Sequence, residues 1–366
     1  MKATITLDII KVSQPIGDIF VAKINPSKLL SMSVVDRRRI EDDVETLGIQ
    51  RELRRDKVSQ IKSYLTSVDA TFPNSIIVNT TSEFLTEVTE TTIELIIDEN
   101  TFTIIDGQHR VEGFRDNDHE NFELIVAIFK DLKIDQQASI FSTINSEQTK
   151  VDPSLNLNLE LNSKVLTPKK MMIEQAQSFN YDKDSPWFDS IKMLGSQSNG
   201  IISLSAFVKP LLELTYPESE YYKIRNELMI NQSEFPNFQN LNYKIEKYIF
   251  WEFYKRKDFS SIYKILFNYF KALKTILNKD WLKNDSVLNK TTGYNAIIHL
   301  FRDVFKDGLE RGDLSEEYFM STLKPLAKFN GTINSLNYGA SGAQASNRLY
   351  IEMKNAIITT TFEVNS

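Results

Sequence analysis

The sequence predicts an α+β protein with two domains: a mixed strand-and-helix domain over residues 1–155 and an all-helical domain over residues 156–366. Two observations lead to this prediction. In the first part, short segments rich in Ile, Val, Thr and Phe alternate with turn residues, which is typical of strands. After about residue 155, apolar residues recur at helical spacing instead. A chain of 366 residues is long enough to build two separate cores.

Six segments of the first domain have the composition of strands: ITLDIIKV, GDIFVAKI, IIVNT, TIELIID, FTIID and ELIVAIF. Between them, Asp56 is positioned to cap a helix that ends before FPNS. Its apolar face is predicted to contain Val58, Ile61, Leu65 and Val68. A second helix ends in INSEQTKV, and its predicted apolar face contains Ile134, Ala138, Phe141 and Ile144.

The second domain contains one helix that is especially clear. It starts at Asp258, and its broad apolar stripe consists of Phe259, Ile262, Leu266, Tyr269, Phe270, Leu273 and Leu277. Similar patterns predict helices within residues 164–180, 201–214, 240–256 and 291–305.

Composition excludes several kinds of chemistry. The chain has no cysteine, which rules out disulfides, thiol catalysis, iron–sulfur clusters and cysteine-containing zinc sites. With only three histidines, we expect any metal to be a hard cation such as Mg²⁺ that arrives with a phosphate ligand. The net charge of −6 argues against a surface that coats nucleic acid, although it allows a local basic face. With no apolar run of roughly 18 residues and no signal-peptide pattern, we expect a cytoplasmic protein without membrane contact.

The segment IIDGQHRVEGF, residues 104–114, concentrates polar side chains at a predicted strand-to-helix junction. The strand FTIID precedes it, and Val111 and Phe114 continue with helical spacing. The unpaired N–H groups and the positive dipole end of a helix N-terminus favour an anion. This location therefore predicts a phosphate site.

Each residue of DGQHR has a function in that interpretation. Gly107 leaves room for an anion, Arg110 donates two parallel hydrogen bonds to a phosphate, and His109 donates to another oxygen. Asp106 orients a Mg²⁺-bound water or fixes the loop, and Gln108 positions a water or a base. The alternative is a plain helix start, with an aspartate cap, a turn glycine and solvated polar residues.

The pentapeptide also resembles the signature of the DGQHR-domain family, which includes DndB, a DNA-phosphorothioation protein, and other DNA-modification-associated proteins. Further segments are similar to that family in the same order: QPIGDIFVAKI, QRELRRDKVSQIKSYL with FPNSIIV, and FSTINSEQTKVDPSL. The resemblance covers roughly residues 10 to 160, and the helical half only weakly.

The DGQHR-domain family in turn resembles the ParB/sulfiredoxin superfamily, in which an equivalent loop ending in His-Arg or Arg-Arg binds nucleotide phosphates. The resemblance implies a ParB/sulfiredoxin-like α/β domain in which Gly107, His109 and Arg110 contact phosphates. It also implies that Asp106 and Gln108 serve a metal or water, so that Asp106, Gln108 and His109 form the catalytic set. Sulfiredoxin has a cysteine where this chain has Gln108, so sulfinic-acid reduction is excluded.

INSEQTKV, residues 144–151, is a second candidate wall of the site. Its polar residues resemble the Asn/Glu cluster that helps ParB-like proteins bind triphosphate and Mg²⁺. Asn145, Glu147 and Gln148 are the candidates for phosphate binding, and Asp106 and Glu147 for the metal. The alternative is a helix C-cap formed by Asn145.

A run of cations is predicted to include DNA contacts, although acidic residues are interleaved with it. Ion pairs such as Arg38 with Asp42 and Arg39 with Asp43 favour an exposed, self-paired helix face for residues 37–39. The cations predicted to contact DNA are Arg51, Arg54, Arg55 and Lys57.

Two further segments have structural alternatives. The aromatic stretch at residues 248–270 could stack nucleic-acid bases, but its helical spacing favours core packing. NYGASGAQASNR, residues 337–348, has neither a Walker A nor a GxGxxG pattern. It is either a flexible loop that closes over a ligand or a glycine turn before a final strand.

Together these observations predict a protein that binds and hydrolyses a nucleoside triphosphate (ATP, CTP or GTP) with Mg²⁺ at DGQHR. Its cycle would act on DNA in a modification or phage-defence system, with other proteins of that system as partners and a homo-oligomer left open. Three alternatives remain. They are a non-enzymatic transcriptional regulator, as the resemblance to DndB implies; a ParB-like, Mg²⁺-dependent nickase; and an assembly factor whose helical half docks a modification enzyme.

Overall fold

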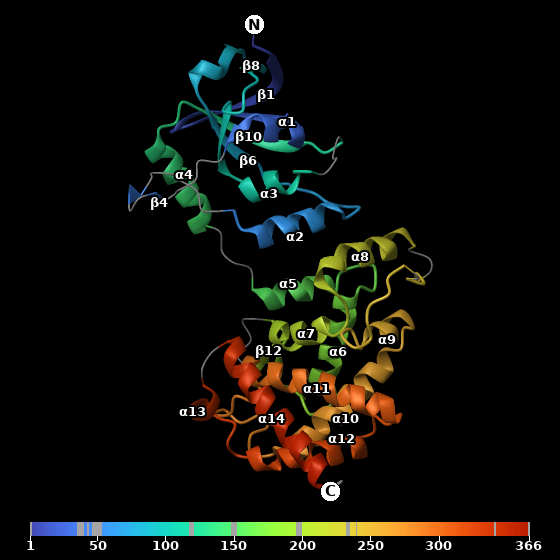
Figure 1. The fold of residues 1–366 in the computed structure, drawn as a ribbon. Coiled ribbons are helices and arrows are strands. Elements are labelled where there is room, and N and C mark those ends of the chain that lie inside the picture. Colours follow the sequence, from blue (N-terminus) through green and yellow to red (C-terminus); the bar gives the residue numbers. More distant parts are fainter. Residues whose placement is uncertain are drawn as a thin grey trace. The chain divides into compact units, whose positions relative to one another are not determined.

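The protein divides into two compact units, Met1–Lys150 and Val151–Ser366, in the computed structural model (Figure 1). The structure describes residues 2–34, 40–41, 44–45, 53–116, 121–147, 152–194, 200–231, 235–238, 240–339 and 342–364. The first unit combines a sheet with helices and the second is almost entirely helical, which confirms the α+β class. The second unit's first helix is α5 (Pro153–Glu160), whose Asp152 cap accepts hydrogen bonds from two backbone N–H groups.

The first unit is built on a mixed eight-stranded sheet with strand order β3-β9-β6-β10-β2-β1-β8-β7. Its strands are β1 (Thr4–Gln14), β2 (Gly17–Ile24), β3 (Ser33–Val34), β6 (Ile76–Thr80), β7 (Leu85–Val88), β8 (Thr92–Ile96), β9 (Phe102–Asp106) and β10 (Leu124–Lys130). β6 pairs in parallel with β10 and β3 with β9, whereas the remaining neighbours are antiparallel. All six predicted strands are confirmed. A separate two-stranded pair consists of β4 (Ile40–Glu41) and β5 (Val44–Glu45).

Helices cover both faces of this sheet. They are α1 (Pro26–Ser31), α2 (Arg55–Leu65), α3 (Gln108–Gly113) and α4 (Ile134–Glu147), with a short 3-10 turn η1 (Ser82–Phe84). Side chains alternate along a strand, so neighbouring residues of β9 point to opposite faces. Ile104 belongs to the larger core, which includes Val111 of α3, whereas Ile105 belongs to a smaller core against which Phe141 of α4 packs.

Two helix predictions in this unit were wrong in detail. Asp56 is not the cap of α2: the helix starts at Arg55, with Arg54 at its N-cap, and the Asp56 carboxylate pairs with the Arg54 side chain. The face of α4 is also different, because Ile134 and Ala138 are exposed while Gln137 is buried. The Gln137 amide can be buried because its Nε2 donates to the carbonyl of Leu132 at 2.9 Å.

The second unit packs its helices around one large aromatic core. Besides α5, these are α6 (Pro168–Tyr181), α7 (Leu204–Glu213), α8 (Tyr221–Ile230), α9 (Trp251–Lys255), α10 (Phe259–Ile276), α11 (Thr291–Arg311), α12 (Glu316–Leu323), α13 (Ser335–Tyr338) and α14 (Ala343–Val364). Short elements complete it: β11 (Ile191–Lys192), β12 (Ile202–Ser203), η2 (Glu218–Glu220) and η3 (Lys324–Phe329).

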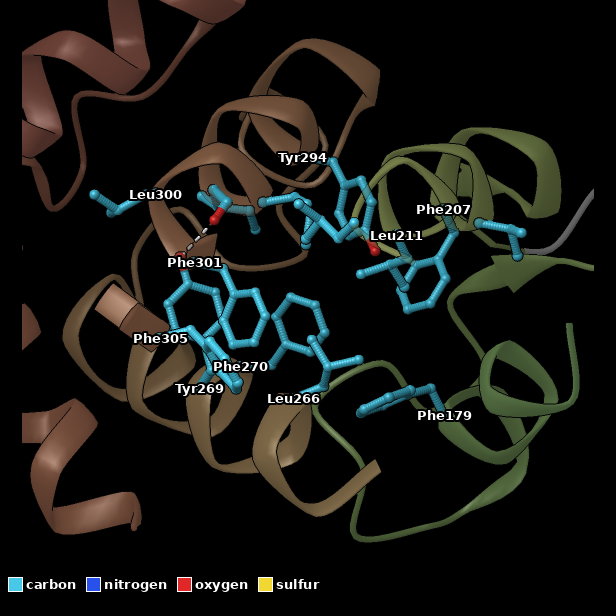
Figure 2. Packing of buried hydrophobic residues seen from close by; sticks show 14 of the residues in the cluster. Phe179, Phe207, Leu211, Leu266, Tyr269, Phe270, Tyr294, Leu300, Phe301 and Phe305 are labelled. Carbon is cyan, nitrogen blue, oxygen red and sulfur yellow. Dashed lines mark hydrogen bonds between the residues drawn. The ribbon is translucent and has the colours of Figure 1, made fainter. Parts of the chain in front are cut away.

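Helix α10 lies at the centre of this core. As predicted, the Asp258 side chain caps it, accepting from the N–H of Ser261 at 3.2 Å. Figure 2 shows Phe270 and Tyr269 of α10 packed among rings from α6, α7 and α11. The hydroxyl of Tyr269 is fully buried and donates to the carbonyl of Ile297 at 2.6 Å. The core-packing interpretation of residues 248–270 is therefore confirmed for the rings that are buried here.

Two predictions for the second unit were wrong. Within residues 240–256 only α9 is helical, and the chain before it forms turns. Residues 337–348 do not lead into a strand, because the long helix α14 follows Gly342. Leu349, Met353 and Ala356 are buried at helical spacing, a pattern that a strand could not bury on one face. Across the described residues, no helix is long and apolar enough to span a membrane.

Candidate functional site

The DGQHR segment lies at a strand-to-helix junction, as predicted. Strand β9 ends at Asp106 and helix α3 starts at Gln108. Gly107, between them, has a φ of +100°, in the left-handed region that side chains disfavour. The chain therefore needs glycine at this turn for conformational reasons alone.

The space around Gly107 is already filled. A Cβ atom built on this glycine would lie 2.5 Å from Cδ1 of Ile76 and 3.1 Å from Nη2 of Arg110. This is the space that an anion was predicted to occupy. In the structure, the β6 side chain and the arginine of the motif occupy it.

The guanidinium group of Arg110 donates hydrogen bonds to acceptors of the protein itself. Nη1 donates to the carbonyl of Asn74 at 2.7 Å, and Nη2 donates to the carbonyl of Ser75 at 3.1 Å. Nη2 also forms an ion pair with the Asp106 carboxylate at 2.9 Å. The side chains of Arg110 and Asp106 are only 19% and 26% exposed. This network fastens α3 to the loop before β6.

His109 connects the motif to a second helix. Its Nε2 accepts a hydrogen bond of 3.1 Å from the backbone N–H of Arg54, the N-cap residue of α2. Because Nε2 is the acceptor, the neutral ring carries its proton on Nδ1. Burial lowers the pKa of His109, and the positive charges of Lys57 and Arg54 lower it further. The neutral ring that this hydrogen bond requires is therefore the favoured form.

Two further residues of the segment, Gln108 and Gly113, are buried. Gln108 is buried, with 7% of its surface exposed. Gly113 lies so close to Ile61 of α2 that a Cβ atom there would overlap the isoleucine side chain. DGQHRVEG therefore contains two glycines that lie close against isoleucine side chains. It also contains three polar side chains whose hydrogen bonds join α3 to the end of β9, the loop before β6 and the start of α2.

The His109 contact predicts a pH dependence. Since the folded-state pKa lies below the ordinary value, the unfolded form binds more protons as the pH falls through that value, and stability is lost on acidification. Between pH 7.5 and 5.5 we expect amides of α2 and α3 to lose hydrogen-exchange protection, after correction for intrinsic exchange rates. In His109→Gln, whose amide oxygen can accept from Arg54 without titrating, this loss should shrink. His299→Gln is the matched control, and an unchanged pH dependence in His109→Gln would contradict the assignment.

The first turn of α2 carries the described part of the predicted basic run. Arg54 pairs with Asp56 at 2.6 Å, whereas Arg55 and Lys57 are exposed and form no ion pair with any described residue. Arg51, the cations at 37–39 and the predicted pairs Arg38 with Asp42 and Arg39 with Asp43 lie outside the described residues.

The predicted second wall includes the last turn of α4. Asn145 and Glu147 lie in the last turn of α4, but their side chains, and the whole of Gln148, lie outside the described part. Helix α4 continues to Glu147, so Asn145 is not its C-cap residue. Among the described side chains, no group of three or more His, Asp or Glu could hold a metal ion. The Mg²⁺ site at Asp106 and Glu147 stays a prediction.

Sequence reasoning missed the partners of the motif. Asn74 and Ser75 act through backbone carbonyls and Arg54 through its backbone N–H, so their side chains gave no signal. The only hint was FPNS, which was interpreted as the end of a helix rather than as an acceptor loop.

A family model described as DndB, DNA-sulfur modification-associated, matches residues 9–361. This match and the two-unit α+β fold define a DNA-modification-associated protein. The chain belongs to the DndB family. The match continues through the helical unit, well beyond residues 10 to 160 where the sequence resemblance was strongest. No curated protein matches the chain.

Proposed function

We propose that this protein is a non-enzymatic DNA-binding member of a DNA-sulfur-modification system. In this proposal, the first turn of α2 contacts DNA phosphates, and DGQHR holds that turn in place. The observation that carries it is the hydrogen bond from the N–H of Arg54 to Nε2 of His109. It supports a structural role for the motif. In this role DGQHR holds the start of α2, the one described helix start that carries the basic run.

The first turn of α2 has the properties of a phosphate contact. The helix has 11 residues, and its N-cap residue, Arg54, makes no side-chain capping hydrogen bond. The positive end of the helix dipole favours an anion there, and the Asp56 carboxylate of this turn is paired with Arg54. Arg55 and Lys57 add two exposed charges at the same position. Phosphate contacts of this kind position a protein on DNA without reading its sequence.

The charge distribution limits the extent of this contact. Residues 1–150 contain 17 Lys and Arg against 25 Asp and Glu, so the unit as a whole repels DNA. Binding should therefore rest on a few local phosphate contacts and depend moderately on salt.

Replacing Arg55 and Lys57 together by Ala tests the proposal. We expect weaker binding to every duplex sequence and a slope of log affinity against log salt that is smaller by about two, since each phosphate contact contributes about one. Fluorescence anisotropy with a labelled duplex over a salt series measures both. The matched control is the double variant Lys28→Ala and Lys133→Ala, which removes two exposed charges of the same unit that lie outside α2. Equal effects in both double variants would contradict a local contact.

A transcriptional regulator is the form of this function that the family resemblance implied, with promoter DNA as the target. Nucleotide binding and hydrolysis, nicking, phage defence and assembly with other modification proteins stay predictions. The contacts of Arg110 favour the regulator over the nucleotide site, because three hydrogen bonds hold its guanidinium to protein acceptors.

A further inference from the structure

A groove of about 680 Å³ lies between α6 and α10 in the second unit. Its lining includes Glu174, Gln175, Tyr181, Asp182, Phe259 and Tyr263. Three aromatic rings and two carboxylates thus share one surface depression. Aromatic faces and carboxylates both attract cations.

Glu174 is the lining carboxylate whose nearby counter-charge, that of Lys170, forms no ion pair with it. It is half-buried, and no described side chain forms an ion pair or hydrogen bond with its carboxylate. Lys170, one turn earlier, donates instead to the carbonyl of Ser163 at 2.6 Å. Burial raises the pKa of Glu174, which Lys170 only partly offsets. A cation placed in the groove would relieve this unfavourable burial of charge.

The other wall of the groove is held in a fixed arrangement. The hydroxyl of Tyr263 donates to Oδ2 of Asp182 at 2.7 Å, while Oδ1 of Asp182 accepts from the N–H of Asp184 at 3.0 Å. The Tyr263 ring packs on Phe179 with centroids 4.6 Å apart, which connects it to the aromatic core shown in Figure 2. Tyr181 is 63% exposed and completes the aromatic lining.

Gln175 supplies an independent observation. This lining residue is only 7% exposed, and its Oε1 is buried with no hydrogen-bond partner among the described residues. Buried acceptors in native proteins are nearly always satisfied, so Oε1 of this lining residue is a candidate acceptor for a donor from a bound ligand. Glutamine oxygen, carboxylate and aromatic faces together match a ligand with several N–H donors on a flat cation.

We propose that this groove binds the guanidinium group of an arginine that a partner protein inserts. A guanidinium stacks on aromatic rings and offers five N–H donors in a plane, which a lysine ammonium does not. The carboxylates exclude DNA phosphate as the occupant, because like charges repel. The groove is open along the surface between two helices, so a side chain anchored on another protein can enter it. This site lies in the second unit and is independent of the proposed DNA contact.

Binding of short peptides to the full-length chain tests the proposal. The probe is an acetylated, amidated peptide with one arginine flanked by glycine and serine, measured by saturation-transfer NMR. The matched peptide carries citrulline, which has nearly the same shape but no charge. We expect binding of the arginine peptide only, and an affinity lower by about tenfold in Glu174→Gln because a charge-assisted pair is lost. Tyr181→Ala should also weaken binding, whereas Glu310→Gln, which removes an exposed charge elsewhere on this unit, should not.

Several results would overturn the proposal. They are equal binding of the arginine and citrulline peptides, full affinity in Glu174→Gln, or no saturation by the arginine peptide. Tighter binding of spermidine than of the arginine peptide would overturn the protein partner, since a free polyamine would then be the better occupant.

Discussion

Replacing Arg110 by Ala is expected to lower the free energy of unfolding of the first unit by about 3 kcal/mol, because a partly buried ion pair and two further charge-assisted hydrogen bonds are lost. The variant leaves the Asp106 carboxylate and the carbonyls of Asn74 and Ser75 without these donors. All three tryptophans, at 187, 251 and 281, lie in the second unit, so their fluorescence does not report on this change. Hydrogen exchange of amides in β6 and β9 measures it directly.

The control is Arg115→Ala, a few residues further along the chain. Arg115 also forms a close ion pair, with Glu112 at 2.7 Å, but its side chain is 54% exposed. Exposed pairs of this kind contribute at most about 1 kcal/mol. If Arg110→Ala proved no more destabilising than Arg115→Ala, the network around Arg110 would not have the structural role assigned to it.

Gly107→Ala is expected to destabilise the first unit by about 3 kcal/mol for two separable reasons. A left-handed backbone costs a non-glycine residue about 1 to 2 kcal/mol, and a new methyl group in filled space costs a further 1 to 3. Here the new Cβ would lie 2.5 Å from Cδ1 of Ile76. Hydrogen exchange in β6, β9 and α3 again provides the readout.

Two variants separate these contributions. Gly17 also has a positive φ, of +133°, but nothing lies within 4 Å of a Cβ built there, so Gly17→Ala adds backbone strain alone. Ile76→Val removes the Cδ1 atom that clashes. We therefore expect the double variant Gly107→Ala with Ile76→Val to be more stable than the sum of the two single effects predicts. Strict additivity would mean that the clash with Ile76 is not what makes glycine necessary.

The sequence predicted the elements of the fold better than their contacts. FTIID was interpreted correctly as a strand and Asp258 as a helix cap, because both signals are local: side-chain composition over a few residues in one case, a carboxylate next to a helical stripe in the other. Of the two alternatives for residues 337–348, the one with a strand after Gly342 was wrong, because Leu349, Met353 and Ala356 recur at helical spacing and are buried on one face of α14.

In the candidate site, the secondary structure could be predicted from the sequence but the hydrogen-bond partners could not. The strand–glycine–helix junction of DGQHR followed from its neighbours in sequence, but the partners of its side chains lie far away along the chain. Nε2 of His109 meets a backbone N–H 55 residues earlier, and Arg110 meets carbonyls 35 and 36 residues earlier. Backbone groups are the same in every residue, so no residue type at those positions could have indicated these bonds. The side chains therefore looked available for a ligand when they were bound to the protein itself.

The most direct test of this account is thermal unfolding of the full-length protein with ATP, GTP or CTP, each with Mg²⁺, at millimolar concentration. A ligand that binds only the folded state stabilises it by about 2.7 kcal/mol at one hundred times its dissociation constant. If DGQHR holds the DNA-contacting turn of α2 in place and is not a nucleotide site, none of the three nucleotides should raise the unfolding midpoint. A rise with one nucleotide that disappears in His109→Gln would contradict the account and make the motif a nucleotide site.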